Sequence, residues 1–390
     1  MSVSIALGLV LAAPIAAIPG SDPQDAQEAG ELDGCELTLE GESTTVGELP
    51  ASIGEWPRKA VQTWAPFAEQ RGLGMHLADG GRVLLLQRQK LKPKRNLTLV
   101  AETAELVDRW FPAPERAPSL VPEAPPVEEV PEGEYYEWSY ESDSSPLESE
   151  TAVLIQVVDQ GEYEAVLAFT AREYDYLQAW APEARQLTGF ILERPLVACW
   201  QERPDGMEEW DIENELVHRL SQLLVLRRFS QLPYWLTMGL AWAVEDEVRG
   251  GIYCFPYRSG FVFATEHGDW WTRLRNETKR LREPFTLDLV ASWKRGTYQP
   301  REALFAYGTA RFLTRHFEPQ AVAAAFEELR LLKAANGRVD HGDGTWSLVV
   351  GWEVPAVDQA RIFEGLRPDF VSLLEASFKK GKSYKLPRRD

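Results

Sequence analysis

The chain has 390 residues and a formal net charge of −19, with 60 acidic side chains against 41 Lys and Arg. This balance argues against nucleic acid as a partner, because binding to phosphates needs clustered Lys and Arg. At 44% hydrophobic and 11% aromatic the chain is able to bury a substantial core, so a wholly disordered chain is excluded.

The acidic charge is concentrated in two short segments. Residues 1–57 hold ten acidic residues and no Lys or Arg, and residues 114–150 hold eleven acidic residues and one Arg. The rest of the chain is close to neutral. The charge therefore indicates solvation, spacing or intramolecular docking of these segments rather than a cationic substrate.

The N-terminal region is first apolar and then acidic. Residues 3–18 form an apolar run that is too short and too interrupted by Pro to predict a transmembrane helix, so we expect a signal peptide over residues 1–20. Export to the periplasm or the cell exterior follows, and a cytoplasmic chain with a misassigned start is the alternative. No integral membrane segment is expected beyond this run. Residues 21–52 are predicted to form a mobile acidic leader.

Residues 53–111 are predicted to form a small helix–hairpin–helix subdomain. Apolar side chains at helical spacing predict helices over residues 55–72 and 97–111, and two apolar runs around Asp79 predict a hairpin over residues 75–87. Residues 112–150 contain eight prolines and eleven carboxylates, which predicts an extended acidic linker. Its Tyr and Trp residues either dock on the following domain or form a recognition segment.

The main domain is predicted over residues 151–380, followed by a basic tail at residues 381–390. Strands are expected at residues 152–158 and within 190–200, with an irregularity at Arg194-Pro195. Helices are expected over residues 163–180, 211–228, 233–249, 301–317, 319–335 and 356–379. Strands that precede helices predict an α+β fold, with a small N-terminal sheet and a mostly helical second half.

The segment from Asn214 to Glu245 contains the most informative pattern. His218 and Gln222 stand one turn apart and are expected on the same face of one helix. A second helix is expected to begin near Pro233, a residue that suits the first turn.

The order Leu232-Pro233-Tyr234-Trp235-Leu236 and then Gly239-Leu240-Ala241, after a helix with His218, resembles the zinc-site core of gluzincin-type metallopeptidases. The resemblance is to the peptidase-MA-like families of exported bacterial proteins, and it covers about residues 150–380. It implies a gluzincin-like fold, with the strands before the zinc helix and Phe305–Phe317 as the helix that packs behind it.

The residues that carry the chemistry of that family are replaced. In the resemblance an H-E-x-x-H helix and a Glu on the second helix bind zinc, and the first Glu is the general base. His218 matches the first ligand, but Arg219 stands for the base, Gln222 for the second His and Met238 for the third ligand. These are predicted to be vestigial positions, with no cofactor. A rearranged metal set of Glu215, His218 and Glu245 stays open, although it lacks a base.

The stretch Ile252–Trp271 is rich in aromatic residues. Residues expected to line a retained binding groove are Tyr253, Phe255, Tyr257, Phe261 and Trp235; ordinary core packing is the alternative. Cys199 and Cys254 are expected to be buried thiols, and a disulfide between them after export is the alternative.

These patterns together predict a non-catalytic, peptidase-like protein that binds or scaffolds a partner at the cell envelope or outside the cell. The partner stays unidentified, with a peptide or a protein as the expected class. Two alternatives remain open: a zinc metallopeptidase with rearranged ligands, and a purely structural envelope protein.

Overall fold

The computed structural model describes residues 34–89, 93–112, 147–202, 211–230, 232–254, 269–291, 293, 300–336, 338–340, 346–348 and 353–387. The predicted signal peptide, the acidic residues 21–33 and most of the predicted linker, residues 113–146, lie outside this range.

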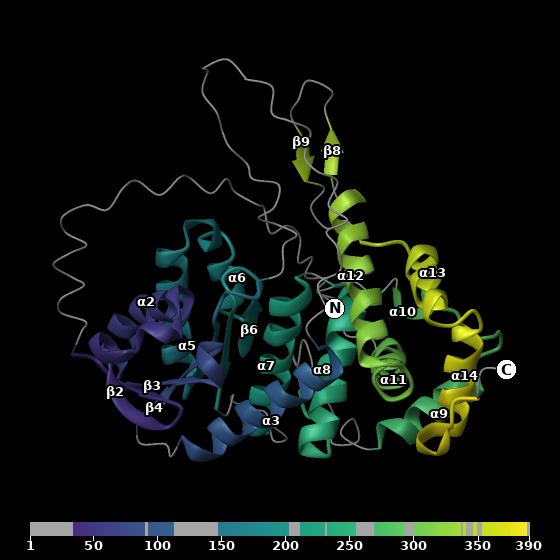
Figure 1. Cartoon of the computed structure of the whole chain (residues 1–390), viewed down its shortest axis with the longest axis horizontal. Coiled ribbons are helices and arrows are strands. Elements are labelled where there is room, and N and C mark those ends of the chain that lie inside the picture. The colour runs from purple at the N-terminus through teal and green to yellow at the C-terminus, as the bar shows by residue number, and fades with distance from the viewer. Residues whose placement is uncertain are drawn as a thin grey trace, which may run out of the picture.

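A seven-stranded mixed sheet with the strand order β2-β1-β3-β4-β5-β7-β6 forms one side of the molecule (Figure 1). Its strands are β1 (Glu36–Leu39), β2 (Glu42–Thr45), β3 (Leu73–Ala78), β4 (Val83–Arg88), β5 (Ala152–Val157), β6 (Gly189–Leu192) and β7 (Val197–Gln201). The β1–β3, β4–β5 and β5–β7 pairs are parallel, and the other pairs are antiparallel.

The central strands of the sheet are buried on both faces. In β5, Leu154 belongs to the core on one face, and Val153 and Ile155 belong to the core on the other face. This follows from the two-residue side-chain period of a strand, and it explains why every residue of this strand except Gln156 is apolar. The sheet is therefore a layer between two sets of helices.

The helices that cover the sheet come mainly from the first half of the chain. They are α2 (Glu55–Arg71), α3 (Lys94–Trp110), α5 (Gln160–Glu173), α6 (Ala181–Ala184) and α7 (Ile212–Phe229). Side chains of α2 and α5 pack on one face, and side chains of α3 and α7 pack on the other.

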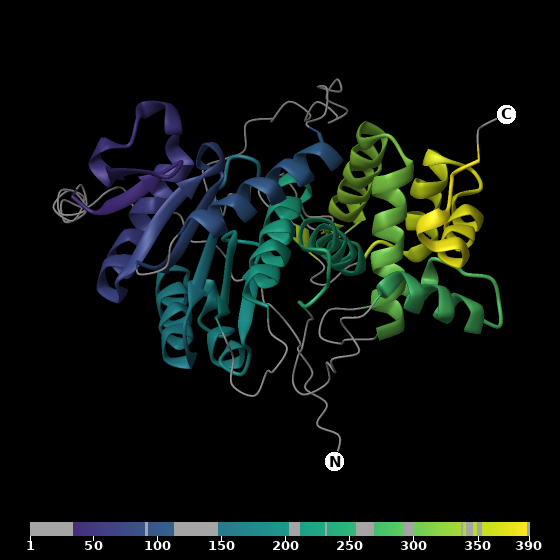
Figure 2. The same ribbon diagram turned by 90° about the horizontal axis from the view of Figure 1, so that it is seen from below.

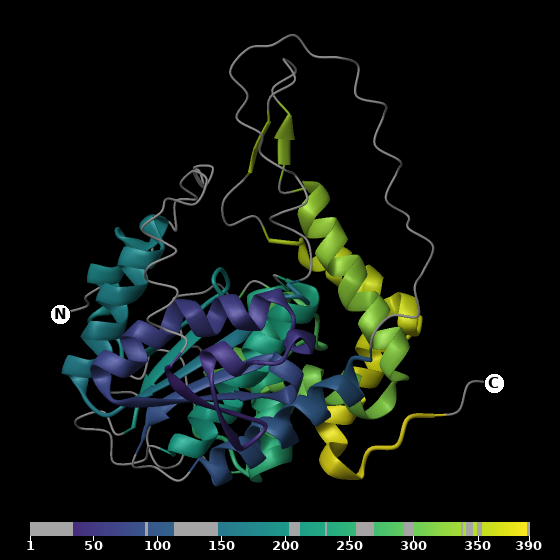
Figure 3. The ribbon, with the colours of Figure 1, turned by 60° about the vertical axis from the view of Figure 1, so that its left-hand side comes forward.

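The helices of the second half form a block on the far side of α7 from the sheet (Figure 2). They are α8 (Tyr234–Arg249), α9 (Trp270–Arg280), α10 (Asp288–Ala291), α11 (Pro300–His316), α12 (Pro319–Asn336), α13 (Ala356–Leu366) and α14 (Phe370–Lys380). A two-stranded hairpin of β8 (Arg338–Asp340) and β9 (Trp346–Leu348) extends beyond the end of α12 (Figure 3).

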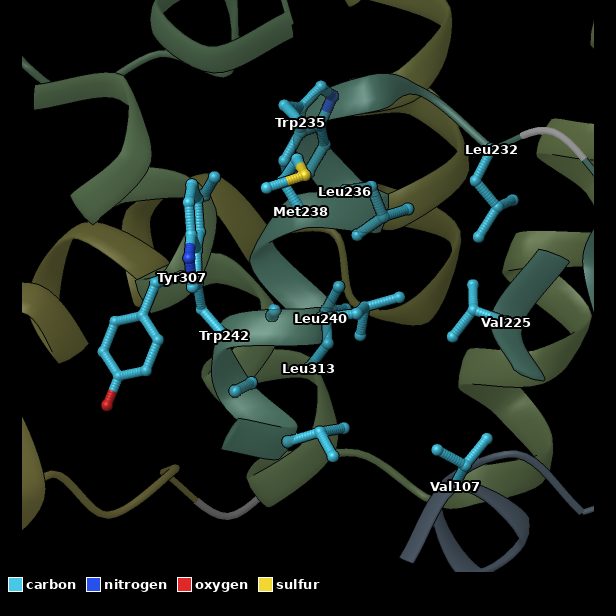
Figure 4. Packing of buried hydrophobic residues seen from close by; sticks show 14 of the residues in the cluster. Val107, Val225, Leu232, Trp235, Leu236, Met238, Leu240, Trp242, Tyr307 and Leu313 are labelled. Atoms are coloured by element: carbon cyan, nitrogen blue, oxygen red, sulfur yellow. The ribbon is translucent and has the colours of Figure 1, made fainter. Parts of the chain in front are cut away.

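Helix α8 lies at the centre of this block. Leu236, Met238 and Leu240 pack in one hydrophobic cluster with Val225 of α7 and Leu313 of α11 (Figure 4). Helix α8 is covered by neighbours on several sides, so its residues from Trp235 to Glu245 are all buried.

The structure is a mixed α/β protein, consistent with the predicted α+β class, and the predicted helix 55–72, hairpin and strand 152–158 are confirmed. Two predicted helices are shorter than expected. The helix predicted over residues 163–180 ends at Glu173, because Tyr174 leaves the helical conformation at φ −131° and ψ 89°. The helix predicted over residues 356–379 is divided into α13 and α14, because Pro368 holds Arg367 in the extended region.

The predicted domain boundaries need three corrections. Strand β4 pairs with β5, so residues 53–111 share one sheet with the main domain and are not a separate subdomain. Residues 36–45, expected in the mobile leader, form β1 and β2, and β1 pairs with β3. The predicted basic tail is not separate from the main domain throughout, because Tyr384 is only 7% exposed and belongs to the main hydrophobic core.

No disulfide joins Cys199 to Cys254, so that alternative is wrong, and the prediction that both are buried thiols is confirmed. Burial raises the pKa of the Cys199 thiol, which opposes a role as nucleophile. Among the described helices, none combines the length and apolar character needed to cross a bilayer.

Candidate functional site

The site predicted from the sequence lies where α7 and α8 pack against each other. The side chain of Asp211 caps the start of α7 by accepting from the backbone N–H groups of Glu213 and Asn214. Helix α7 lies between the sheet and α8, and for this reason it is buried on nearly all sides. Its N-terminal half still carries a run of buried polar residues, namely Asn214, Glu215, His218, Arg219, Ser221 and Gln222.

His218, Gln222 and Met238, which match the three zinc-ligand positions of the resemblance, form one cluster in which Gln222 contacts the other two. The Gln222 amide nitrogen lies 2.7 Å from Nε2 of His218 and 3.4 Å from the sulfur of Met238. Nδ1 of His218 lies 3.0 Å from Oε2 of Glu245. When the Glu245 carboxyl is ionised, a neutral imidazole with its proton on Nδ1 satisfies this arrangement, since Nε2 then accepts from Gln222 and Nδ1 donates to Glu245.

Glu245 connects α7, α8 and the segment that follows α8. Besides His218, its carboxylate accepts from the Asn214 amide at 2.6 Å, from the backbone N–H of Cys254 at 3.0 Å and from the backbone N–H of Tyr253. Complete burial raises the pKa of Glu245 to about 8, although these N–H donors lower it. Both oxygens of this carboxyl group are thus bound by groups of the protein itself.

Arg219 points away from this cluster, towards the edge of the sheet. Its guanidinium donates to Glu215 at 2.9 Å and to the carbonyl oxygen of Phe190 at 3.2 Å. Burial opposes its charge, but the ion pair with Glu215 keeps the pKa of Arg219 above its usual range. A side chain at Gly189 would place a Cβ 2.5 Å from the guanidinium, so the glycine makes room for Arg219 between α7 and β6.

The residues present do not fit a zinc ion. Both ring nitrogens of His218 are engaged by protein groups, and neither the Gln222 amide nitrogen nor the Met238 thioether is a usual zinc ligand. Within the part of the chain that the structure describes, no group of three or more His, Cys, Asp or Glu residues is arranged to hold a metal.

The rearranged set of Glu215, His218 and Glu245 is only partly assembled. His218 and Glu245 are in contact, but Glu215 is paired with Arg219. The structure therefore corrects this alternative: two of its three members meet, and the third is bound to a guanidinium.

The predicted groove residues are not gathered into a groove in the described part of the chain. Trp235 is completely buried, and its indole N–H donates to Gln359 at 2.8 Å, so its role is packing against α13. Tyr253 is half-buried and binds Glu245 through its backbone. Phe255, Tyr257 and Phe261 lie outside the described residues.

The sequence reasoning missed Asn214, which joins Glu245 to the carbonyl oxygen of Gly251. Its position one turn before His218, on the same helical face, is the signal that would have found it.

The chain was also compared with known proteins. No protein-family model and no curated protein sequence matches it.

Proposed function

We propose that this chain is a non-catalytic, gluzincin-like protein that binds or scaffolds a partner, a peptide or a protein, at the cell envelope or outside the cell. The observation that carries the proposal is the direct contact of His218, Gln222 and Met238 at the positions where the resemblance has zinc ligands. These groups satisfy one another, and the position of the general base is taken by Arg219, which is bound to Glu215.

The geometry of His218 supports the descent of this cluster from a metal site. A His that binds zinc through one ring nitrogen usually donates its other N–H to a carboxylate, which orients the ring. The pairing of His218 Nδ1 with Glu245 has this form, and the Gln222 amide stands at the free side of the ring. In this proposal, Glu245 keeps the role of the carboxylate that orients the His ring, whereas the second and third zinc ligands are lost.

Loss of peptidase activity follows from the same contacts. The enzyme alternative needs a carboxylate base beside a metal-bound water, and the carboxylate of Glu245 is already the acceptor of several N–H groups. His218 is 2% exposed and Glu245 is 0% exposed, so water does not reach these groups in this closed arrangement.

The closed cluster also favours a second candidate, a purely structural envelope protein. In that case the former cleft only joins α7 to α8. Thermal-shift measurements with peptide pools separate the two candidates: a rise in Tm that depends on peptide concentration supports a binding protein, and its absence across the pools supports a structural one.

Metal analysis of the purified chain tests the proposal. After incubation with equimolar zinc and gel filtration, we expect less than stoichiometric metal and no cleavage of a peptide library. Stoichiometric zinc together with cleavage that a chelator abolishes would overturn the proposal in favour of the enzyme.

A designed variant provides the converse test. Gln222→His combined with Met238→Glu restores two ligands next to His218, and we expect zinc to bind and to raise the Tm of this variant. Gln320→His, which adds an exposed His on α12, is the matched control. If the double variant folds and gains no more zinc than the control, the resemblance of this frame to a zinc site is refuted.

Adding Arg219→Glu to that pair restores the general base as well. The new carboxylate would stand one turn from Glu215, so the fold of the triple variant is checked first by circular dichroism. Export is tested separately by sequencing the N-terminus of the protein recovered from the periplasm or the medium.

A further inference from the structure

A cavity of about 220 Å³ lies among the C-terminal helices, apart from the α7–α8 cluster. Figure 1 shows α9, α11 and α14 around this end of the molecule, on the side away from the sheet. Side chains that line the cavity are Trp271, Phe312, Arg315, His316, Lys382 and Tyr384. None of them is acidic, and the volume exceeds the roughly 150 Å³ that a benzene-binding cavity offers.

The walls of the cavity are aromatic. The His316 ring lies 5.3 Å from both the Phe312 and the Tyr384 rings, measured between centroids. The Arg315 guanidinium lies 6.0 Å from the centre of the Trp271 ring. Such walls suit a flat apolar group, which stacks or packs edge-on against the rings.

Two buried donors belong to these walls. The indole N–H of Trp271 and the hydroxyl of Tyr384 are buried and have no hydrogen-bond partner among the residues that the structure describes. An unpaired buried donor destabilises the fold, and an indole N–H is able only to donate. A ligand that brings an acceptor oxygen to Trp271 or Tyr384 would satisfy these groups.

The charge at the mouth of the cavity is positive. Arg315 and Lys382 are both exposed at its edge. Burial, together with the nearby Arg315, lowers the pKa of His316, so this imidazole is neutral near pH 7 and available as a hydrogen-bond partner. Three acidic residues interact electrostatically with lining residues: Glu247 with Arg315, Asp269 with Lys382 and Asp369 with Tyr384. None of these carboxylates lines the cavity itself.

We propose that this cavity binds a small organic anion, in which a carboxylate or a phosphate group is attached to a flat apolar body. Arg315 and Lys382 hold the charged group, since charge-assisted hydrogen bonds to such oxygens are strong and directional. The rings of Trp271, Phe312 and Tyr384 enclose the apolar body. This site is independent of the α7–α8 cluster and of its relation to peptidases.

Isothermal titration calorimetry of the full chain tests the proposal with four probes: benzoate, phenyl phosphate, inorganic phosphate and benzyl alcohol. We expect one aromatic anion to bind at least about tenfold more tightly than both inorganic phosphate, which has no ring, and benzyl alcohol, which has no charge. The comparison of benzoate with phenyl phosphate identifies the anionic group. If neither aromatic anion binds at millimolar concentration, the proposal is overturned.

Charge variants locate the binding. Arg315→Gln and Lys382→Gln are each expected to weaken binding by about tenfold. The matched control is Lys379→Gln on α14, whose ammonium is paired with Glu375 at 2.6 Å, and it should bind as the unmodified chain does. Equal affinities for all three variants would overturn the assignment of this cavity.

A variant that removes a single donor separates a binding role from a structural one. Tyr384→Phe keeps the ring and deletes one unpaired donor, so without ligand the free energy of unfolding should stay equal or rise. The affinity for the aromatic anion should fall by about fivefold or more. If stability falls and affinity is unchanged, this donor serves the fold and the proposal is wrong.

Discussion

Replacement of Glu245 by Gln is expected to change how the free energy of unfolding depends on pH. Burial raises the pKa of Glu245 in the folded chain to about 8, against 4.5 for an unperturbed Glu. Between these values the folded chain retains a proton that the unfolded chain has released. The stability contributed by Glu245 is therefore complete below pH 4.5 and is lost as the pH rises through about 8.

The magnitude follows from one proton. A difference of one bound proton changes the free energy of unfolding by about 1.4 kcal/mol per pH unit. Over a range of about two pH units, from weakly acidic to neutral, the unmodified chain should lose about 3 kcal/mol through Glu245. The Glu245→Gln variant has no carboxyl at this position and should lack this part of the slope.

Urea denaturation followed by tryptophan fluorescence at a series of pH values measures the difference between the two proteins. Titrating groups that do not contact Glu245 cancel in that difference; His76, whose pKa is lowered by burial, contributes the opposite slope to both. The titration of His218 is coupled to that of Glu245, so the difference reports the pair. The exposed Glu364 of α13 provides the control, since Glu364→Gln should leave the slope unchanged. Parallel pH profiles for Glu245→Gln and the unmodified chain would show that Glu245 is ionised when folded, and would refute the reasoning.

Three further predictions concern stability and are measured by the same denaturation. A Cβ at Gly239 would lie 2.4 Å from a backbone oxygen of α11, so Gly239→Ala should lower the free energy of unfolding by about 2–3 kcal/mol. The control Gly365→Ala has open space around it and should stay within about 1 kcal/mol of the unmodified chain. Equal effects would contradict the packing. Asp211→Ala removes the N-cap of α7 and should cost about 1 kcal/mol, and no loss would show that the cap is dispensable. Arg219→Gln removes the guanidinium partner of the buried Glu215 and should cost about 3–5 kcal/mol, most of which Glu215→Gln in the same chain should restore; a double variant as unstable as the single one would argue against the ion pair.

Local patterns in the sequence predicted most single elements of the fold, and long-range pairing was what they missed. The largely apolar run at residues 152–157 predicted β5, and the hairpin of β3 and β4 followed from its turn residues. The pairing of β4 with β5 joins segments separated by the predicted linker, and no local pattern encodes which strands lie side by side. The acidic composition of residues 36–45 predicted a leader, although short edge strands also carry many polar side chains.

The candidate site was predictable where it depends on helical geometry. The spacing of His218 and Gln222 placed them on one face, and they are in contact. Trp235 was wrongly expected in a groove, because an aromatic residue on a helix does not reveal which neighbour covers it. Here α13 covers that face and supplies Gln359 as the acceptor. The cavity around Arg315 and Lys382 unites residues far apart in the sequence, so only the structure brings them together.

The residues of α8 that match the resemblance are ones whose presence packing explains without a metal. Gly239 permits the close approach of α8 to α11, and Trp235, Leu240 and Ala241 are buried in the helical block. These demands act on any sequence that folds α7, α8 and α11 in this way, whether or not it binds zinc. The positions that hold zinc ligands in the resemblance are under no such demand, and here Gln222 donates a hydrogen bond to the sulfur of Met238. A frame that packing explains is evidence for the arrangement of the helices, and the chemistry has to be judged from the side chains at its centre.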